Sequence, residues 1–94
     1  MKIKVKGYLT FKDVIGAYIL DLGEKEGTTL RELLIRISIE KKMGDSLYNA
    51  AEQGINRGVI VLLNGRNLTS LAHHLDYLLV DGDEIAIFPP LVGG

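Results

Sequence analysis

The chain has 94 residues, 47% of them hydrophobic and 24% charged, which is the composition of a soluble globular protein with one modest core. We therefore expect a single domain spanning residues 1–94. The formal net charge of −1 argues against nucleic acid or membrane lipid as the main partner, and the absence of cysteine excludes disulfides, thiolate metal sites and a cysteine nucleophile.

Two strands are predicted near the N-terminus. Residues 2–8 (KIKVKGY) alternate, with Ile3 and Val5 on one face and three lysines on the other, which is the pattern of a strand with one side toward a core. Residues 11–16 (FKDVIG) form a predicted connection, and residues 17–22 (AYILDL) form a second strand that pairs with the first as a hairpin.

Charge and hydropathy along the chain limit its partners. The lysines of the first strand, Lys2, Lys4 and Lys6, form either a solvated face or a docking patch for an acidic partner. The N-terminus lacks the apolar segment of a signal peptide, and no apolar run reaches the roughly 18 residues of a membrane span. We therefore expect no membrane contact and a cytoplasmic location.

The clearest helix begins after Thr29. Thr29 and Glu32 have the Thr-x-x-Glu spacing of a capping box. Lys41 and Lys42 follow where a helix C-terminus favours positive charge, and Gly44 is the residue expected to close the helix. The apolar residues between them recur at three- and four-residue intervals and share one face: Leu30, Leu33, Leu34 and Ile37. Off this stripe, two residues either widen the buried face or contact a partner: Ile35 and Ile39.

The second half of the chain predicts short elements joined by turns. Residues 45–52 predict a short helix, and residues 59–63 (VIVLL) a strand covered on both faces for part of its length. Asn64-Gly65 and Asp81-Gly82 are turn signals, and residues 83–88 (DEIAIF) predict the final strand. Between the two turns, Ser70 is a candidate cap of a helical turn with the leucines Leu71, Leu75 and Leu78.

This order of elements predicts one sheet packed on one main helix. A final strand placed beside the first would run parallel to it, so a mixed sheet of four or five strands is expected. This is the β-grasp arrangement, an α+β fold. Because one helix covers only one face of such a sheet, the other face is exposed to solvent or contacts a partner.

No motif supports catalysis by this chain alone. Neither a Gly-x-Ser-x-Gly elbow nor a glycine-rich phosphate loop occurs. His73-His74 is a poor metal site because neighbouring side chains point in different directions, and residues 81–84 (DGDE) are too short for a calcium loop. We therefore expect no enzyme activity, no bound metal and no bound cofactor.

The C-terminal tail carries the most specific signal. If Ile85 and Ile87 of the final strand face the helix, Phe88 lies on the open face as a candidate contact. Two prolines then end the strand and direct the predicted flexible tail, residues 89–94, away from the body. The terminal Gly93-Gly94 has no Cβ, so it can carry the terminal carboxylate through a narrow channel into another protein's active site. A frayed end that happens to be glycine is the alternative.

The whole chain resembles the MoaD type of sulfur carrier, the small subunit of molybdopterin synthase, and its relatives among Urm-type and small archaeal ubiquitin-like modifiers. Residues 2–16 (KIKVKGYLTFKDVIG), 61–68 (VLLNGRNL) and above all 81–94 (DGDEIAIFPPLVGG) carry the resemblance. Residues 70–80 (SLAHHLDYLLV) depart from it, because many relatives have a less bulky loop there.

The resemblance implies a chemistry for the tail. A MoeB- or ThiF-like adenylating enzyme uses ATP to form an acyl-adenylate on Gly94, and a sulfur donor protein displaces AMP to leave a thiocarboxylate. A MoaE-like large subunit supplies the catalytic side chains and takes the sulfur into molybdopterin. The resemblance makes Gly93 the channel residue, and it implies a docking segment of Phe88, Pro89, Pro90, Leu91 and Val92.

Three alternatives use the same sequence features. The chain could modify target proteins through isopeptide bonds between Gly94 and their lysines. It could carry sulfur for tRNA thiolation or for thiamine, although thiamine-type carriers more often lack the Phe-Pro-Pro element. It could also be a plain interaction module with an incidental tail.

Overall fold

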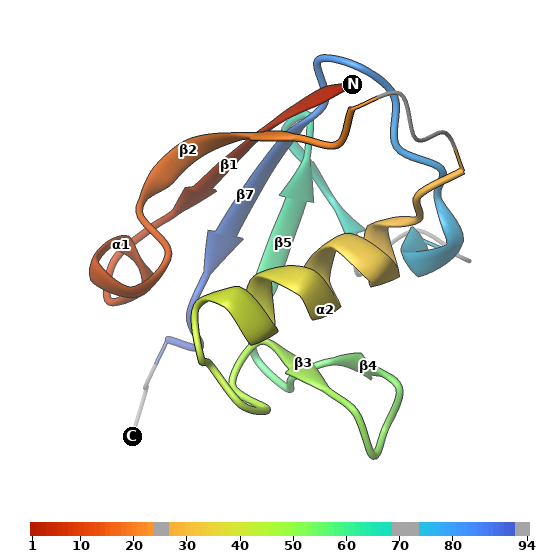
Figure 1. The fold of residues 1–94 in the computed structure, drawn as a ribbon. Coiled ribbons are helices and arrows are strands. Elements are labelled where there is room, and N and C mark those ends of the chain that lie inside the picture. The colour runs from red at the N-terminus through yellow and green to blue at the C-terminus, as the bar shows by residue number, and fades with distance from the viewer. Residues whose placement is uncertain (24–26, 69–73, 92–94) are drawn as a thin grey trace.

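The computed structural model describes residues 1–23, 27–68 and 74–91. Its strands and helices follow one another from the N-terminus to the start of the tail (Figure 1). In chain order they are β1 (Lys2–Gly7), α1 (Phe11–Val14), β2 (Ala17–Asp21), α2 (Leu30–Glu40), β3 (Tyr48–Asn49), β4 (Gly54–Ile55), β5 (Ile60–Leu63), β6 (Arg66–Asn67), the 3₁₀ helix η2 (His74–Asp76) and β7 (Glu84–Phe88).

Five strands of the described chain form one mixed sheet in the order β2-β1-β7-β5-β6. β1 pairs antiparallel with β2 and parallel with β7, and β5 pairs antiparallel with β7 and β6. The helix α2 crosses one face of this sheet (Figure 1). The predicted hairpin, the parallel first and last strands and the β-grasp arrangement are therefore confirmed.

The core lies between α2 and the sheet. Ile3 and Val5 of β1 are buried while the lysines between them are exposed, as the alternation predicts. The apolar stripe of α2 meets them from the other side, and each fully buried aliphatic side chain contributes about 1.5–3 kcal/mol by leaving water. This stripe consists of Leu30, Leu33, Leu34 and Ile37, each at most 1% exposed.

The two ends of α2 differ in how well the sequence predicted them. At the N-terminus Thr29 Oγ1 accepts the N–H of Glu32 at 3.2 Å, which confirms the cap. At the C-terminus the expected closure at Gly44 is wrong, because the left-handed residue after the helix is Lys42, with φ 54°. The N–H of Lys42 reaches Ile39 O and that of Met43 reaches Ser38 O, which is a Schellman motif.

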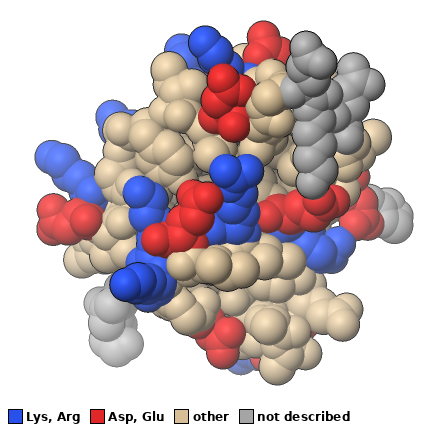
Figure 2. All heavy atoms as spheres, in the orientation of Figure 1, with Lys and Arg blue, Asp and Glu red and all other residues tan. Residues whose placement is uncertain are grey.

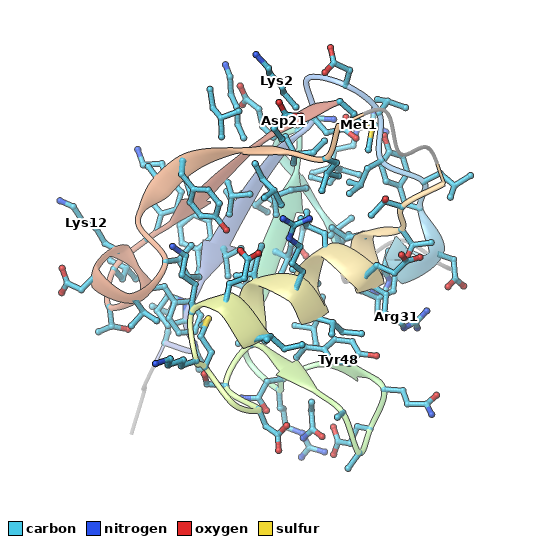
Figure 3. All side chains as sticks on the ribbon, in the orientation of Figure 1. Met1, Lys2, Lys12, Asp21, Arg31 and Tyr48 are labelled. Carbon is cyan, nitrogen blue, oxygen red and sulfur yellow. The ribbon has the colours of Figure 1, made fainter. Side chains whose placement is uncertain are left out.

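Residues 45–52 form a turn and β3 instead of the predicted helix. Leu47 and Tyr48 are buried against the core, and the Tyr48 hydroxyl accepts a hydrogen bond from Arg31 of α2 at 3.2 Å (Figure 3). The Asn49 side chain accepts the N–H of Glu52, which favours a turn over a helix. Packing on α2 thus outweighs the local helix signal, and β3 pairs with β4 as a small separate sheet.

Three smaller predictions have mixed outcomes. The connection at residues 11–16 contains the single-turn helix α1. Ile35 packs against the edge of the core, whereas Ile39 is 72% exposed on the outer side of α2. The helical turn expected from Ser70 falls partly on residues 69–73, which lie outside the described chain; η2 follows, with Leu75 buried and Leu78 exposed. Among the described helices, none has the length and apolar character needed to cross a membrane.

Candidate functional site

The predicted site begins at the end of β7. Ile85 and Ile87 are buried toward α2, so Phe88 lies on the open face of the sheet and is half-buried there. The prediction that Phe88 lies on the open face is therefore confirmed. β7 lies between β1 and β5, so its final residue is held by strands on both sides.

The base of the tail is held more closely than the sequence suggests. Pro89 is buried and Pro90 half-buried, whereas Leu91 is 77% exposed. The chain therefore leaves the body of the protein at Leu91 and not directly at the prolines. The remaining predicted site residues lie outside the described chain: Val92, Gly93 and Gly94.

Tyr8 is a member of the site that the sequence reasoning did not single out. Its ring stacks on Phe88 with centroids 4.5 Å apart and planes 9° from parallel. The Tyr8 N–H donates to Ile87 O at 2.9 Å, which fixes the backbone beside β7. The alternation in the sequence could have identified Tyr8, because it continues the even-numbered positions of β1, which face away from the core. Stacked aromatic pairs of this kind add about 0.5–1.5 kcal/mol beyond their buried area.

The Tyr8–Phe88 pair borders a shallow depression of about 350 Å³ on the open face. Its apolar lining includes Leu62 of β5 and Ala86 of β7, which are paired neighbours, and Tyr8, which directly follows β1. Its charged lining consists of Lys4, Lys6 and Glu84, so two basic side chains stand beside one acidic side chain. An apolar centre beside basic side chains is suited to a protein partner with an apolar anchor and an acidic border.

The lysine row is only partly occupied by contacts within the chain. Lys4 Nζ lies 3.4 Å from a carboxylate oxygen of Glu84, and both side chains are more than 60% exposed, so solvent screens this pair. Lys6 Nζ lies 4.9 Å from the centroid of the Tyr8 ring. Lys4 and Lys6 therefore form a charged border beside the aromatic pair. This arrangement fits both interpretations of the lysine row, a solvated face and a docking patch.

A buried carboxylate fixes the other end of β7. Asp83 is 3% exposed and accepts three hydrogen bonds, from Asn64 Nδ2 at 2.9 Å, Val80 N at 2.9 Å and the Tyr77 hydroxyl at 3.1 Å. Asn64 in turn accepts the N–H of Glu84 at 2.8 Å. Burial, followed by the hydrogen bond to Asp83, raises the pKa of Tyr77. The Asp-Gly-Asp turn therefore joins the β5–β6 turn to the start of β7.

No cluster of metal-ligating side chains occurs among the described residues. His74 lies in η2, and His73 belongs to the part of the chain that is not described. On the face that carries α2, acidic and basic side chains are interspersed (Figure 2).

The mixed sheet, the helix across one face and the central strand that leads through the two prolines to the exposed Leu91 define a ubiquitin-like β-grasp protein. The sequence matches the ThiS family over residues 16–94, and the chain belongs to that family. This finding bears out the resemblance seen in the sequence.

The similarity to known proteins and solved structures extends over nearly the whole chain. Small archaeal modifier protein 3 of Haloferax volcanii is 30% identical over 98 residues, which cover all of both chains. Urm1 of Trypanosoma brucei is 26% identical with a TM-score of 0.79, covering 99% of this chain and 95% of its own. A putative molybdopterin converting factor, subunit 1, of Pyrococcus furiosus is 27% identical with a TM-score of 0.66, covering 96% and 98%.

The chain is therefore a small ubiquitin-like protein of the carrier and modifier type to which these homologues belong. Within this class the predicted roles of individual residues stay predictions. The structure contributes the geometry: a central strand, an aromatic pair on the open face and a tail that becomes exposed at Leu91.

Proposed function

We propose that this protein is a sulfur carrier for molybdopterin synthesis, acting as the small subunit of molybdopterin synthase. Its Gly94 carboxylate attacks the α-phosphate of ATP, giving an acyl-adenylate and pyrophosphate. A sulfur donor protein then supplies sulfide sulfur, which displaces AMP and leaves a thiocarboxylate. A MoaE-like large subunit then takes up the tail and catalyses transfer of this sulfur to a cyclic pterin precursor, and water returns Gly94 to a carboxylate. The cytoplasm, which supplies ATP, is the proposed location.

The observation that supports the proposal is the point at which the chain leaves the sheet. The central strand β7 leads through Pro89 and Pro90 to the exposed Leu91, and the sequence ends three residues later in Gly-Gly. From Leu91 onward the chain can reach about 13 Å when extended. A terminal carboxylate at that distance can enter a partner's active site while the folded body remains outside.

The proposal divides the chemistry between the proteins as the family resemblance implies. This chain contributes the carboxylate, and its proposed partners contribute the catalytic side chains: a MoeB- or ThiF-like adenylating enzyme and the MoaE-like subunit. The aromatic pair of Tyr8 and Phe88 is the proposed anchor for these partners, because it is the stacked apolar feature nearest to the tail base. The Pyrococcus furiosus relative, named a putative molybdopterin converting factor, supports the molybdopterin assignment.

A second candidate function is protein modification through isopeptide bonds to Gly94. The relative named small archaeal modifier protein 3, 30% identical over the full chain, favours it. Both functions begin with the same adenylation and differ in the nucleophile that follows. Sulfur delivery for tRNA thiolation or thiamine remains an alternative destination of the thiocarboxylate.

The decisive experiment is the intact mass of protein purified from its native host. The proposal predicts a species heavier by one oxygen-to-sulfur exchange, mapped to Gly94 by fragmentation. Blots for higher-mass conjugates separate the modifier from the carrier. An unmodified C-terminus, together with no ATP–pyrophosphate exchange by the adenylating enzyme, would refute both functions. Removal of the last two glycines should abolish adenylation and leave the fold intact.

A further inference from the structure

The tail base touches the body at a residue far away in the sequence. β5 and β7 lie side by side and antiparallel at the centre of the sheet, so β5 begins at the end where β7 leaves it (Figure 1). Their last paired residues there are Ile60 and Phe88. The same register continued by two residues places Gly58 opposite Pro90.

The contact between Gly58 and Pro90 is too close for a side chain at position 58 unless the proline shifts. A Cβ at position 58 would lie 3.0 Å from Pro90 Cβ and 3.4 Å from its Cγ. Carbon atoms pack favourably at about 3.5–4.0 Å, so such a Cβ would push the proline ring away. Pro90 is half-buried at this place, and the exposed chain begins at the next residue, Leu91.

Gly58 is itself held in a fixed position. It has φ +84° in a turn closed by the hydrogen bond from Val59 N to Asn56 O, at 3.1 Å, so it is the third residue of a type II turn. The turn is anchored at Asn56, whose N–H donates to Leu47 O at 2.8 Å and whose Nδ2 donates to Ser46 O at 3.3 Å. Val59 is buried in the core. The surface under Pro90 is therefore a firm part of the body.

We propose that Gly58 is a positioning residue for the tail: the turn at Asn56–Val59 seats Pro90, and this seat sets the point and direction at which Leu91 to Gly94 leave the body. This inference rests on the proposed function. It makes the freely extending part of the tail start at Leu91, which limits the carboxylate to about 13 Å from the seat. A side chain at position 58 redirects the tail without touching the open face.

The test compares Gly58→Ala with Gly82→Ala. Gly82 has φ +88°, so both substitutions force alanine into the same left-handed backbone region, but nothing lies within 4 Å of a Cβ at Gly82. It also lies at the opposite end of β7. Both variants should lose the stability that a left-handed alanine costs, and Gly58→Ala should lose more because Pro90 must also move. Only Gly58→Ala should displace Pro90, seen as loss of the NOE between residue 58 and Pro90 and a changed heteronuclear NOE at Leu91.

The functional readout is steady-state adenylation by the adenylating enzyme of the same organism, measured as ATP–pyrophosphate exchange. Gly58→Ala should lower kcat at least about tenfold, because a misdirected carboxylate reaches the ATP in fewer productive encounters. KM for the carrier should stay within about twofold, because docking by the open face is intact. Gly82→Ala should leave both constants near those of the unmodified chain.

A double-variant comparison checks that the effect passes through the proline. In a Pro90→Gly background the ring is absent, so adding Gly58→Ala should cause no further loss of kcat. Equal kcat for Gly58→Ala and Gly82→Ala, or an undiminished Gly58→Ala effect in the Pro90→Gly background, would overturn the inference. If the unmodified chain is not adenylated, the proposed function fails instead. The NMR comparison then decides alone: an unchanged heteronuclear NOE at Leu91 in Gly58→Ala overturns the inference.

Discussion

Asp83 offers a quantitative test of how the end of β7 opposite the tail is fixed. Replacing it by alanine removes the acceptor of three hydrogen bonds, from Asn64, Val80 and Tyr77. A hydrogen bond to a charged acceptor contributes about 1.5–3 kcal/mol, which sets an upper range near 5–9 kcal/mol for three. Asn64 and Val80 are exposed residues whose N–H groups can regain water, so the sum is reduced. We expect Asp83→Ala to lower the free energy of unfolding by about 3 kcal/mol.

The assay is urea denaturation at neutral pH, with the slope m compared between variants to check that both unfold alike. For a chain of this size a loss of about 3 kcal/mol corresponds to a fall in Tm of about 12 °C or more. A loss below about 1 kcal/mol would show that the buried carboxylate does not fix β7, and the reasoning would fail.

A swapped pair provides the matched control. In Asp83→Asn alone, the new amide N–H₂ can face the N–H₂ of Asn64, so two donors meet without an acceptor. We expect this variant to lower the free energy of unfolding by about 1–2 kcal/mol. Adding Asn64→Asp restores a donor and an acceptor at that position, and it keeps an oxygen for the Glu84 N–H. The double variant should regain at least half of the loss. Additive losses in the double variant would contradict a direct hydrogen bond between the two side chains.

Four further predictions concern the partner surface, the helix end, the buried hydroxyl of Tyr18 and the stability at alkaline pH. Phe88→Ala should weaken binding to the adenylating enzyme or large subunit by about 1–3 kcal/mol in calorimetry, whereas Leu78→Ala, an exposed leucine in the η2–β7 connection, should not; equal effects would remove the aromatic pair as an anchor. Lys42→Gly should raise the free energy of unfolding by about 0.5–1 kcal/mol, because Lys42 has φ 54°; a loss of stability in urea denaturation would contradict this. Tyr18→Phe should also stabilise, by about 0.5–1 kcal/mol, because the Tyr18 hydroxyl is buried without a hydrogen-bond partner. Burial first, and then the nearby Glu40, raise the pKa of the Tyr18 hydroxyl above 10.0 in the folded protein. The folded state therefore favours the protonated hydroxyl. The resulting contribution to the free energy of unfolding is fully present below pH 10 and is lost as pH rises through the folded pKa. The unmodified chain should therefore lose more stability above about pH 10 than Tyr18→Phe, and parallel pH profiles would argue against this reasoning.

The elements that the sequence predicted well are those set by local pattern. The alternation of Ile3 and Val5, the cap at Thr29 and the Asn64-Gly65 turn each need only neighbouring residues, and each is present in the structure. The segment at Leu47 and Tyr48 was predicted wrongly because its conformation depends on burial under α2, which no local pattern encodes.

The site divides in the same way. Phe88 could be placed on the open face because β7 alternates, and this requires no knowledge of other strands. The stacking of Tyr8 on Phe88 requires the parallel pairing of β1 with β7, and the seat of Pro90 on Gly58 requires the register of β5 with β7. These contacts join residues about 30 or more positions apart, so they follow from the topology of the sheet and not from spacing along the chain.

The central position of β7 has a mechanical consequence. A pull on the tail acts along β7, which is hydrogen-bonded to β1 on one side and to β5 on the other. The force therefore loads both ladders lengthwise, so that many hydrogen bonds must break together instead of one after another as at the open edge of a hairpin. A partner that binds the C-terminus and pulls on it can therefore apply a large force at Leu91 before the domain unfolds.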